Sequence, residues 1–161
     1  MRRGEVFPGS KTALVTGASR GIGRCYALQL AALGYNVLMV ASGEEELLST
    51  ADEVRRASHD VWVRTLVKDL ATPTAAEELF AYTETEGIKV DVLVNNAGIF
   101  SFCDILSTPV ERIERVIFLH DITTTKTCRL YAKDMIGRGG GRILNPYCAW
   151  HHERWETVLH L

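Results

Sequence analysis

Short apolar runs alternate along this chain with longer amphipathic stretches, and the two patterns predict different elements. Five runs are rich in aliphatic residues and carry few charges, which is typical of strands buried on both faces of a sheet. They are TALVT at 12–16, NVLMVA at 36–41, VWVRTLV at 61–67, VDVLVN at 90–95 and RILN at 142–145.

The stretches between these runs have the spacing and the end signals of helices. Gly34 is placed to end the first helix, and Thr72 and Pro73 are suited to the N-cap and first position of the third. The predicted helices cover about 23–33, 44–58, 72–87 and 108–137. Strands that alternate with helices form βαβ units with right-handed crossovers. The sequence therefore predicts a three-layer, doubly wound parallel α/β sheet of about five strands in the order 3-2-1-4-5, with a ligand crevice between strands 1 and 4.

Composition narrows the class of protein. The length of 161 residues suits a single domain, here 1–161, and 47% apolar with 24% charged residues is ordinary for a globular protein. A net charge of −2 gives no reason to expect nucleic acid or an anionic membrane as a partner. The N-terminus does not resemble a signal peptide, and no apolar stretch reaches the roughly 18 residues that cross a bilayer. The cysteines Cys25, Cys103, Cys128 and Cys148 form no CxxC pair. We expect reduced thiols, no metal site and a cytoplasmic protein.

The glycine-rich stretch TGASRGIG, at 16–23, lies where the first strand meets the first helix. Gly17, Gly21 and Gly23 remove Cβ atoms where the turn is tight and where a ligand approaches the backbone. The helix that follows presents unpaired N–H groups and a positive dipole end to a pyrophosphate. A purely structural turn is the alternative, but the position after a first β-strand favours nucleotide binding.

Three motifs in order carry a resemblance to a known family. TGASRGIG is followed by Asp69-Leu70 and then by VDVLVNNAG at 90–98. With these pieces, residues 11–145 resemble the short-chain dehydrogenase/reductase family, whereas the tail 146–161 diverges. The resemblance implies a Rossmann sheet, an NAD(P) cofactor and hydride transfer between that cofactor and an alcohol or carbonyl substrate.

The same resemblance assigns cofactor-binding residues. The pyrophosphate and the adenosine ribose would be held by Gly17, Ser19, Arg20, Gly21, Ile22 and Gly23. Asp69 would accept a hydrogen bond from the adenine amino group, with the Leu70 backbone beside it. Asn96, Ala97 and Gly98 would line the cofactor, although the asparagine side chain can equally serve to tie the central strands together.

The residue type at the end of the second strand indicates whether NADP or NAD is the preferred cofactor. An acidic residue there would bind the ribose diol and repel a 2′-phosphate. The corresponding place is Ala41-Ser42-Gly43, and the first acid is Glu44. Arg20 could pair with a 2′-phosphate, so we expect NADP rather than NAD; the alternative is that Arg20 is only a solvated cation.

The catalytic residues of the family, an Asn, a Ser, a Tyr and a Lys, are not matched. The Asn position, 15 residues before Met135, is His120, which could hydrogen-bond water or simply pack in the helix layer. Where the Ser belongs the chain reads Pro146-Tyr147-Cys148, and no tyrosine has a lysine four residues on. We therefore assign no catalytic residue, and we expect weak cofactor binding with little or no turnover. A frameshift, an early stop or a natural short product would each explain the ending.

The tail suggests a short helix, because Trp155, Val158 and Leu159 are spaced to share one helix face. We expect that helix to cover part of the fifth strand. His151, His152 and His160 could suggest a metal, but the first two are adjacent and would point apart. The sheet edge and the long helix favour self-association or a homo-oligomer. Two alternatives stay open: a reductase that uses His120, Tyr147 or Cys148, and a non-catalytic dinucleotide-binding or protein-interaction module.

Overall fold

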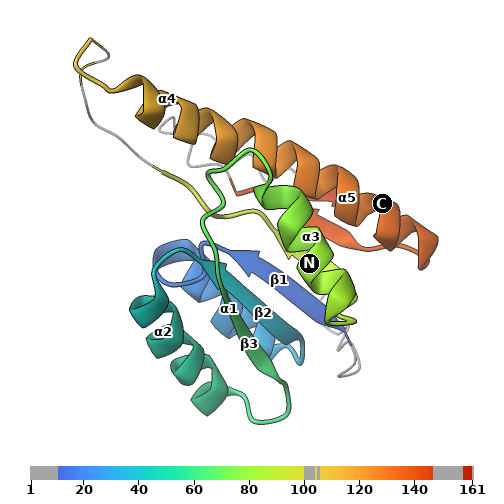
Figure 1. Ribbon diagram of the computed structural model, residues 1–161. Coiled ribbons are helices and arrows are strands. Elements are labelled where there is room, and N and C mark those ends of the chain that lie inside the picture. The colour runs from blue at the N-terminus through green and yellow to red at the C-terminus, as the bar shows by residue number, and fades with distance from the viewer. Residues whose placement is uncertain (1–10, 100–103, 105, 147–157, 161) are drawn as a thin grey trace.

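A single twisted sheet runs through the protein, in the order β3-β2-β1-β4-β5-β6 (Figure 1). The computed structural model describes residues 11–99, 104, 106–146 and 158–160. The strands are β1 (Thr12–Thr16), β2 (Asn36–Ala41), β3 (Val63–Val67), β4 (Val90–Val94), β5 (Arg142–Leu144) and β6 (Val158–His160). The first five are parallel and in the predicted order 3-2-1-4-5, which confirms the doubly wound fold.

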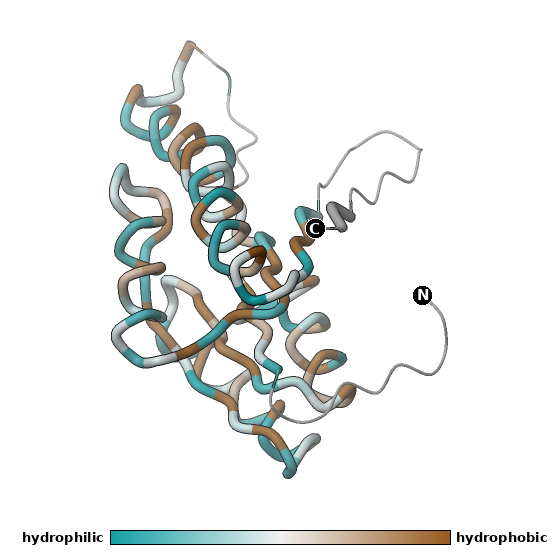
Figure 2. The backbone as a smooth tube through the Cα atoms, turned by 90° about the vertical axis from the view of Figure 1, so that its right-hand side faces the viewer, coloured by the Kyte–Doolittle hydropathy of each residue, from teal (hydrophilic) through white to brown (hydrophobic). Residues whose placement is uncertain are grey.

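Helices cover both faces of this sheet. They are α1 (Gly21–Ala32), α2 (Glu44–Ala57), α3 (Ala75–Thr85), α4 (Val110–Ile117), the π-helix η1 (Phe118–Thr123) and α5 (Thr124–Gly137). On one face, Ala13 and Val15 of β1 pack in a core that includes α1 and α2. On the other, Leu14 packs in a core that includes Tyr131 and Met135 of α5. Apolar and polar positions alternate along the helices as this layering requires (Figure 2).

The third helix begins later than the sequence suggested. Its N-cap residue is Thr74, and Ala75 is its first residue. Thr72 instead accepts a backbone hydrogen bond from Ala75 in the preceding turn, at 3.3 Å. The prediction of Thr72 as N-cap was therefore wrong, because Thr72 and Pro73 lie in a turn that precedes the helix.

The predicted long helix is continuous from α4 through η1 to α5, but it is not uniform. The π-helical segment falls at its centre and contains His120, and π-helical turns occur frequently at functional sites. No residue of α4 is buried, so this end lies away from the core (Figure 1). Within the described residues, no helix is long and apolar enough to cross a membrane.

The end of the tail forms a strand rather than a helix. β6 pairs antiparallel with β5, with Leu144 opposite Val158 and Arg142 opposite His160. The physical reason is the open edge of β5, whose backbone groups are satisfied by a ladder and not by a covering helix. The helix prediction was wrong for these residues, although they do cover the edge. Trp155, His151 and His152 lie outside the described residues.

Candidate functional site

The predicted cofactor residues gather where the parallel strands end. Gly17 leaves β1 with φ +63° and Gly21 opens α1 with φ +55°, both in the left-handed region that favours glycine. Ala18 is fully buried, and its N–H donates to the Val40 carbonyl of β2 at 3.2 Å. The turn is therefore anchored to the neighbouring strand while Arg20 and Gly21 face solvent.

Thr16 and Asn96 connect this turn to the end of β4. The Thr16 hydroxyl donates to the Val94 carbonyl at 3.2 Å and accepts from the backbone N–H groups of Asn96 and Ala97, each at 3.0 Å. The Asn96 amide nitrogen donates to the carbonyls of Thr16 and Gly17, at 3.1 and 3.2 Å. The Asn96 side chain thus supports the turn, as the structural interpretation of this motif suggested.

Close packing explains why positions 17 and 23 are occupied by glycine. A Cβ atom on Gly23 would lie 2.1 Å from the Gly17 carbonyl oxygen and 2.5 Å from the Asn96 amide nitrogen. A Cβ atom on Gly17 would lie 2.8 Å from the Ala97 Cα. No side chain fits at either place, so the first turn of α1 approaches the ends of β1 and β4 as backbone.

The N-terminus of α1 has no side-chain cap from its own N-cap residue or first turn. Arg20 is the N-cap residue and makes no side-chain hydrogen bond there, and the first turn carries no acid. Ile22 is 58% exposed, and a Cβ on Gly21 would meet nothing within 4 Å. Unpaired N–H groups and the helix dipole at such an end favour an anion. These residues therefore fit the pyrophosphate of a dinucleotide.

Two further predicted residues flank this turn. The Ser19 carbonyl accepts from the buried Thr50 of α2 at 2.7 Å, which holds the turn against that helix. Ser42 is exposed directly after β2. Arg20 lies 4.0 Å from Glu46, and both side chains are well exposed, so this pair is weak and leaves the guanidinium available to another anion.

Asp69 lies in the segment after β3, beside the long helix. Its Oδ1 accepts from the Ala71 N–H at 2.9 Å, and its Oδ2 lies 2.9 Å from Nη1 of Arg115. Desolvation raises the pKa of Asp69, but the Ala71 hydrogen bond and the Arg115 guanidinium outweigh it and hold that pKa below its usual range. Leu70 is buried, and its carbonyl accepts from the Thr123 hydroxyl at 2.8 Å.

His120 meets the other side of the site, at the end of β4. Its Nε2 lies 3.1 Å from the Ile99 nitrogen and 3.0 Å from the Ile99 oxygen, so the tautomer decides which group it bonds. A Cβ on Gly98 would lie 3.1 Å from the His120 ring. The His120 ring therefore packs against the backbone of Gly98 and Ile99.

Polar groups tie α5 to the ends of β4 and β5. Asn95 donates to Asn145 at 2.9 Å and to the Cys128 sulfur at 3.3 Å, and Thr127 donates to Asn95 at 3.0 Å. Burial raises the pKa of Tyr131, whose hydroxyl lies in the core beside Thr83. Tyr147 and Cys148 lie outside the described residues. Among the residues that the structure describes, no group of three or more His, Cys, Asp or Glu side chains could hold a metal.

Sequence reasoning missed four residues that shape the site. Thr16 stands in the glycine motif but was not assigned a role. Thr50, Arg115 and Thr123 reach the site from helices, and no local pattern in the sequence distinguishes them from ordinary surface or core positions.

Comparison with known proteins agrees with this geometry. The short chain dehydrogenase family profile matches residues 11–148. The very-long-chain 3-oxoacyl-CoA reductase of Ajellomyces capsulatus is 33% identical over 139 residues, covering 85% of this chain and 41% of that protein. A 3-oxoacyl (acyl-carrier-protein) reductase from Agrobacterium tumefaciens C58, solved with NADP bound, has a TM-score of 0.78 at 25% identity, covering 90% of this chain and 55% of that one. L-sorbose reductase from Gluconobacter frateurii, complexed with NADPH and L-sorbose, has a TM-score of 0.77 at 28% identity, covering 87% and 53%.

The sheet order, the glycine turn and the profile match over most of the chain define a dinucleotide-binding oxidoreductase class. The chain belongs to the short chain dehydrogenase family. It spans about half the length of the curated relatives it matches, 41% of the fungal reductase and 49% of a bacterial 7beta-hydroxysteroid dehydrogenase.

Proposed function

We propose that this chain binds a nicotinamide dinucleotide, NADP(H) in preference to NAD(H), across the ends of β1, β3 and β4. The observation that carries the proposal is the open N-terminus of α1 behind the glycine turn. Its first residues, Gly21 and Ile22, are exposed, and no side-chain cap bonds this end, at the place where Gly17 and Gly23 bring backbone against Asn96 and Ala97. In this arrangement Ser19, Gly21 and Ile22 would hold the pyrophosphate, and Ala97 and Gly98 would line the cofactor.

The preference for NADP(H) rests on charge at the end of β2. Ser42 follows β2, where a carboxylate would repel a 2′-phosphate, and Arg20 is a mostly exposed cation that lies 4.0 Å from Glu46 in the first turn of α2. A guanidinium forms strong charge-assisted hydrogen bonds with phosphate. Both of the solved structures compared above carry NADP or NADPH, which is consistent with this preference.

The parent reaction is hydride transfer between NADP(H) and an alcohol or carbonyl substrate, as the names of the relatives suggest. The 161 residues contain no Tyr-x-x-x-Lys pair. Loss of a proton donor alone lowers a rate by about 10²–10⁴, so we expect this chain to bind cofactor with little or no turnover. The alternative is a non-catalytic dinucleotide-binding or protein-interaction module.

Cys25 and Cys128 are free thiols, which favours a reducing compartment, and we propose the cytoplasm.

Calorimetric titration of the chain with NADPH and with NADH tests the cofactor. We expect tighter binding of NADPH. Arg20→Gln should weaken NADPH binding by about tenfold, equal to ~1.4 kcal/mol, because it removes the cation that pairs with the 2′-phosphate. NADH binding should change little.

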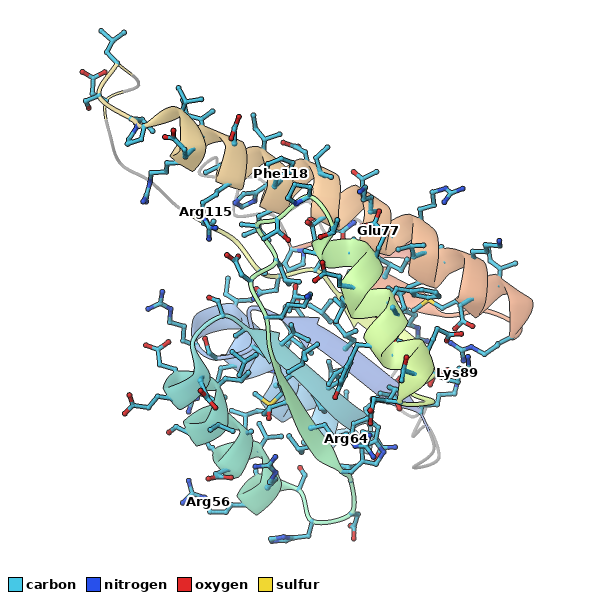
Figure 3. The ribbon with its side chains drawn as sticks, in the orientation of Figure 1. Arg56, Arg64, Glu77, Lys89, Arg115 and Phe118 are labelled. Carbon is cyan, nitrogen blue, oxygen red and sulfur yellow. The ribbon has the colours of Figure 1, made fainter. Side chains whose placement is uncertain are left out.

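The matched control is Arg56→Gln, which makes the same charge change at the far end of α2 (Figure 3). It should leave both affinities unchanged. Tighter binding of NADH by the wild-type chain would contradict the NADP preference, and binding of neither nucleotide would contradict the whole proposal.

We also propose self-association through the long helix. Val110, Ile117, Ile122 and Ile136 are 64%, 47%, 37% and 61% exposed. Exposed apolar groups of this kind favour contact with a second surface. Sedimentation over a range of concentrations should show association, and a monomer at every concentration would contradict it.

A further inference from the structure

Arg115 connects the long helix to the carboxylate proposed to recognise adenine. It extends from α4 (Figure 3). Its Nη1 lies 2.9 Å from Oδ2 of Asp69. The Ala71 N–H donates to Oδ1 of the same carboxylate, also at 2.9 Å. Among the described residues each oxygen of Asp69 thus has one of these two partners, and a carboxylate oxygen can accept more than one hydrogen bond.

A second contact fixes the same loop against the same helix. The buried Thr123 hydroxyl of η1 donates to the Leu70 carbonyl at 2.8 Å. The backbone beside Asp69 and the side chain of Asp69 are therefore held from two successive segments of one continuous helix. This leaves the carboxylate few alternative orientations.

Folding stability does not account for this pair. The two side chains are 48% and 41% exposed, and ion pairs with such exposure contribute little to stability. The contacts of Asp69 with Ala71 and Arg115 instead act on the carboxylate that we propose as a ligand-binding group. Desolvation raises the pKa of Asp69 by less than the Ala71 N–H and the guanidinium lower it, so Asp69 is an ionised acceptor at neutral pH, as an ordinary aspartate is, and the two contacts serve mainly to orient it.

We propose that Arg115 is a positioning residue for base recognition, which holds Asp69 so that its remaining lone pairs accept the amino group of adenine. This inference rests on the proposed function, because Asp69 must lie at the adenine end of the dinucleotide. An amino group only donates, whereas the oxo group of hypoxanthine only accepts. A correctly oriented carboxylate therefore favours adenine over hypoxanthine, and Arg115 sets how strongly.

Calorimetry with two oxidised ligands, NADP⁺ and its hypoxanthine analogue, tests this on the full chain. The wild type should bind NADP⁺ about tenfold more tightly, equal to ~1.4 kcal/mol. Arg115→Gln should remove most of that preference by weakening NADP⁺ alone. Arg115→Lys, which keeps the charge without the planar fork, should restore part of it. Asp69→Asn should also abolish the preference, and Arg115→Gln should add nothing in the Asp69→Asn background.

The control variant is again Arg56→Gln, which should keep the full preference. Equal weakening of both ligands by Arg115→Gln would show a general structural role and overturn the inference, as would an unchanged preference. If Arg115→Gln fails to fold, Arg115→Lys becomes the test. Its preference for NADP⁺ over the hypoxanthine analogue must then be smaller than that of the wild type. A wild type that binds both ligands equally would overturn the roles of Asp69 and Arg115 but leave dinucleotide binding intact. Binding of neither ligand would overturn the proposed function as well.

Discussion

Backbone contact at Gly23 is the feature on which the glycine turn depends most. The first turn of α1 lies so close to Gly17 that a Cβ at Gly23 would stand 2.1 Å from a carbonyl oxygen. The Asn96 amide fills the remaining space and satisfies the carbonyls of Thr16 and Gly17. Packing at this point therefore holds the anion-binding end of α1 against the strand that lines the other side of the site.

Gly23→Ala should lower the free energy of unfolding by about 1–3 kcal/mol, because overpacking forces the backbone apart. It should weaken dinucleotide binding as well. Urea denaturation measures the first effect and calorimetry the second. The matched control is Gly137→Ala at the end of α5, where a Cβ meets nothing within 4 Å and alanine favours the helix. Unchanged stability of Gly23→Ala would contradict the contact.

At this scale the sequence predicted the turn but not the residues that hold it. TGASRGIG and NNAG are local patterns, and both segments lie where those patterns indicated. Thr16, Thr50 and Arg115 act through contacts between residues distant in sequence, such as the 31 positions that separate Thr50 from Ser19. No spacing rule reports a contact of that kind.

Tyr131 connects two elements, α3 and α5, within the core. Its hydroxyl lies 3.1 Å from the Thr83 hydroxyl, and its ring meets Phe80 edge-on with centroids 5.1 Å apart. Desolvation raises the pKa of Tyr131, and the hydrogen bond to Thr83 only partly opposes it. The neutral phenol is thus the form that the folded protein favours.

Tyr131→Phe should cost about 0.5–1.5 kcal/mol at neutral pH through the lost hydrogen bond. Because the folded pKa is raised, the neutral phenol's contribution is fully present below the unfolded pKa of about 10 and is lost as pH rises above it. The wild type should therefore lose more stability than Tyr131→Phe between neutral and strongly alkaline pH. Urea denaturation at both pH values checks this, with Tyr82→Phe on α3 as control. A parallel loss in both proteins would contradict the buried phenol.

Helices and strands could be predicted where apolar residues recur with a clear spacing along the sequence. Five strands and their order follow from apolar runs alternating with helices. The π-helical segment η1 was not predicted, because no sequence signal marks a change of helical pitch. The final strand β6 was not predicted either, because Val158 and Leu159 suit a helix face and a strand equally, and only the open edge of β5 favours the strand.

The whole molecule is a doubly wound sheet with helices packed on both faces. The chain spans about half the length of the curated relatives it matches. The described part brings the turn at 17–23, the loop at 69–71 and the strand end at 96–98 to one edge of the sheet, with the long helix in contact with the last two. We propose that one dinucleotide lies across these three segments.

Backbone amide hydrogen exchange with and without saturating NADPH tests this placement of the dinucleotide. We expect added protection at 17–23, 69–71 and 96–98, with little change at the opposite ends of the strands. Protection confined to another surface, such as the groove of Phe80, Leu130 and Lys133 between α3 and α5, would contradict it.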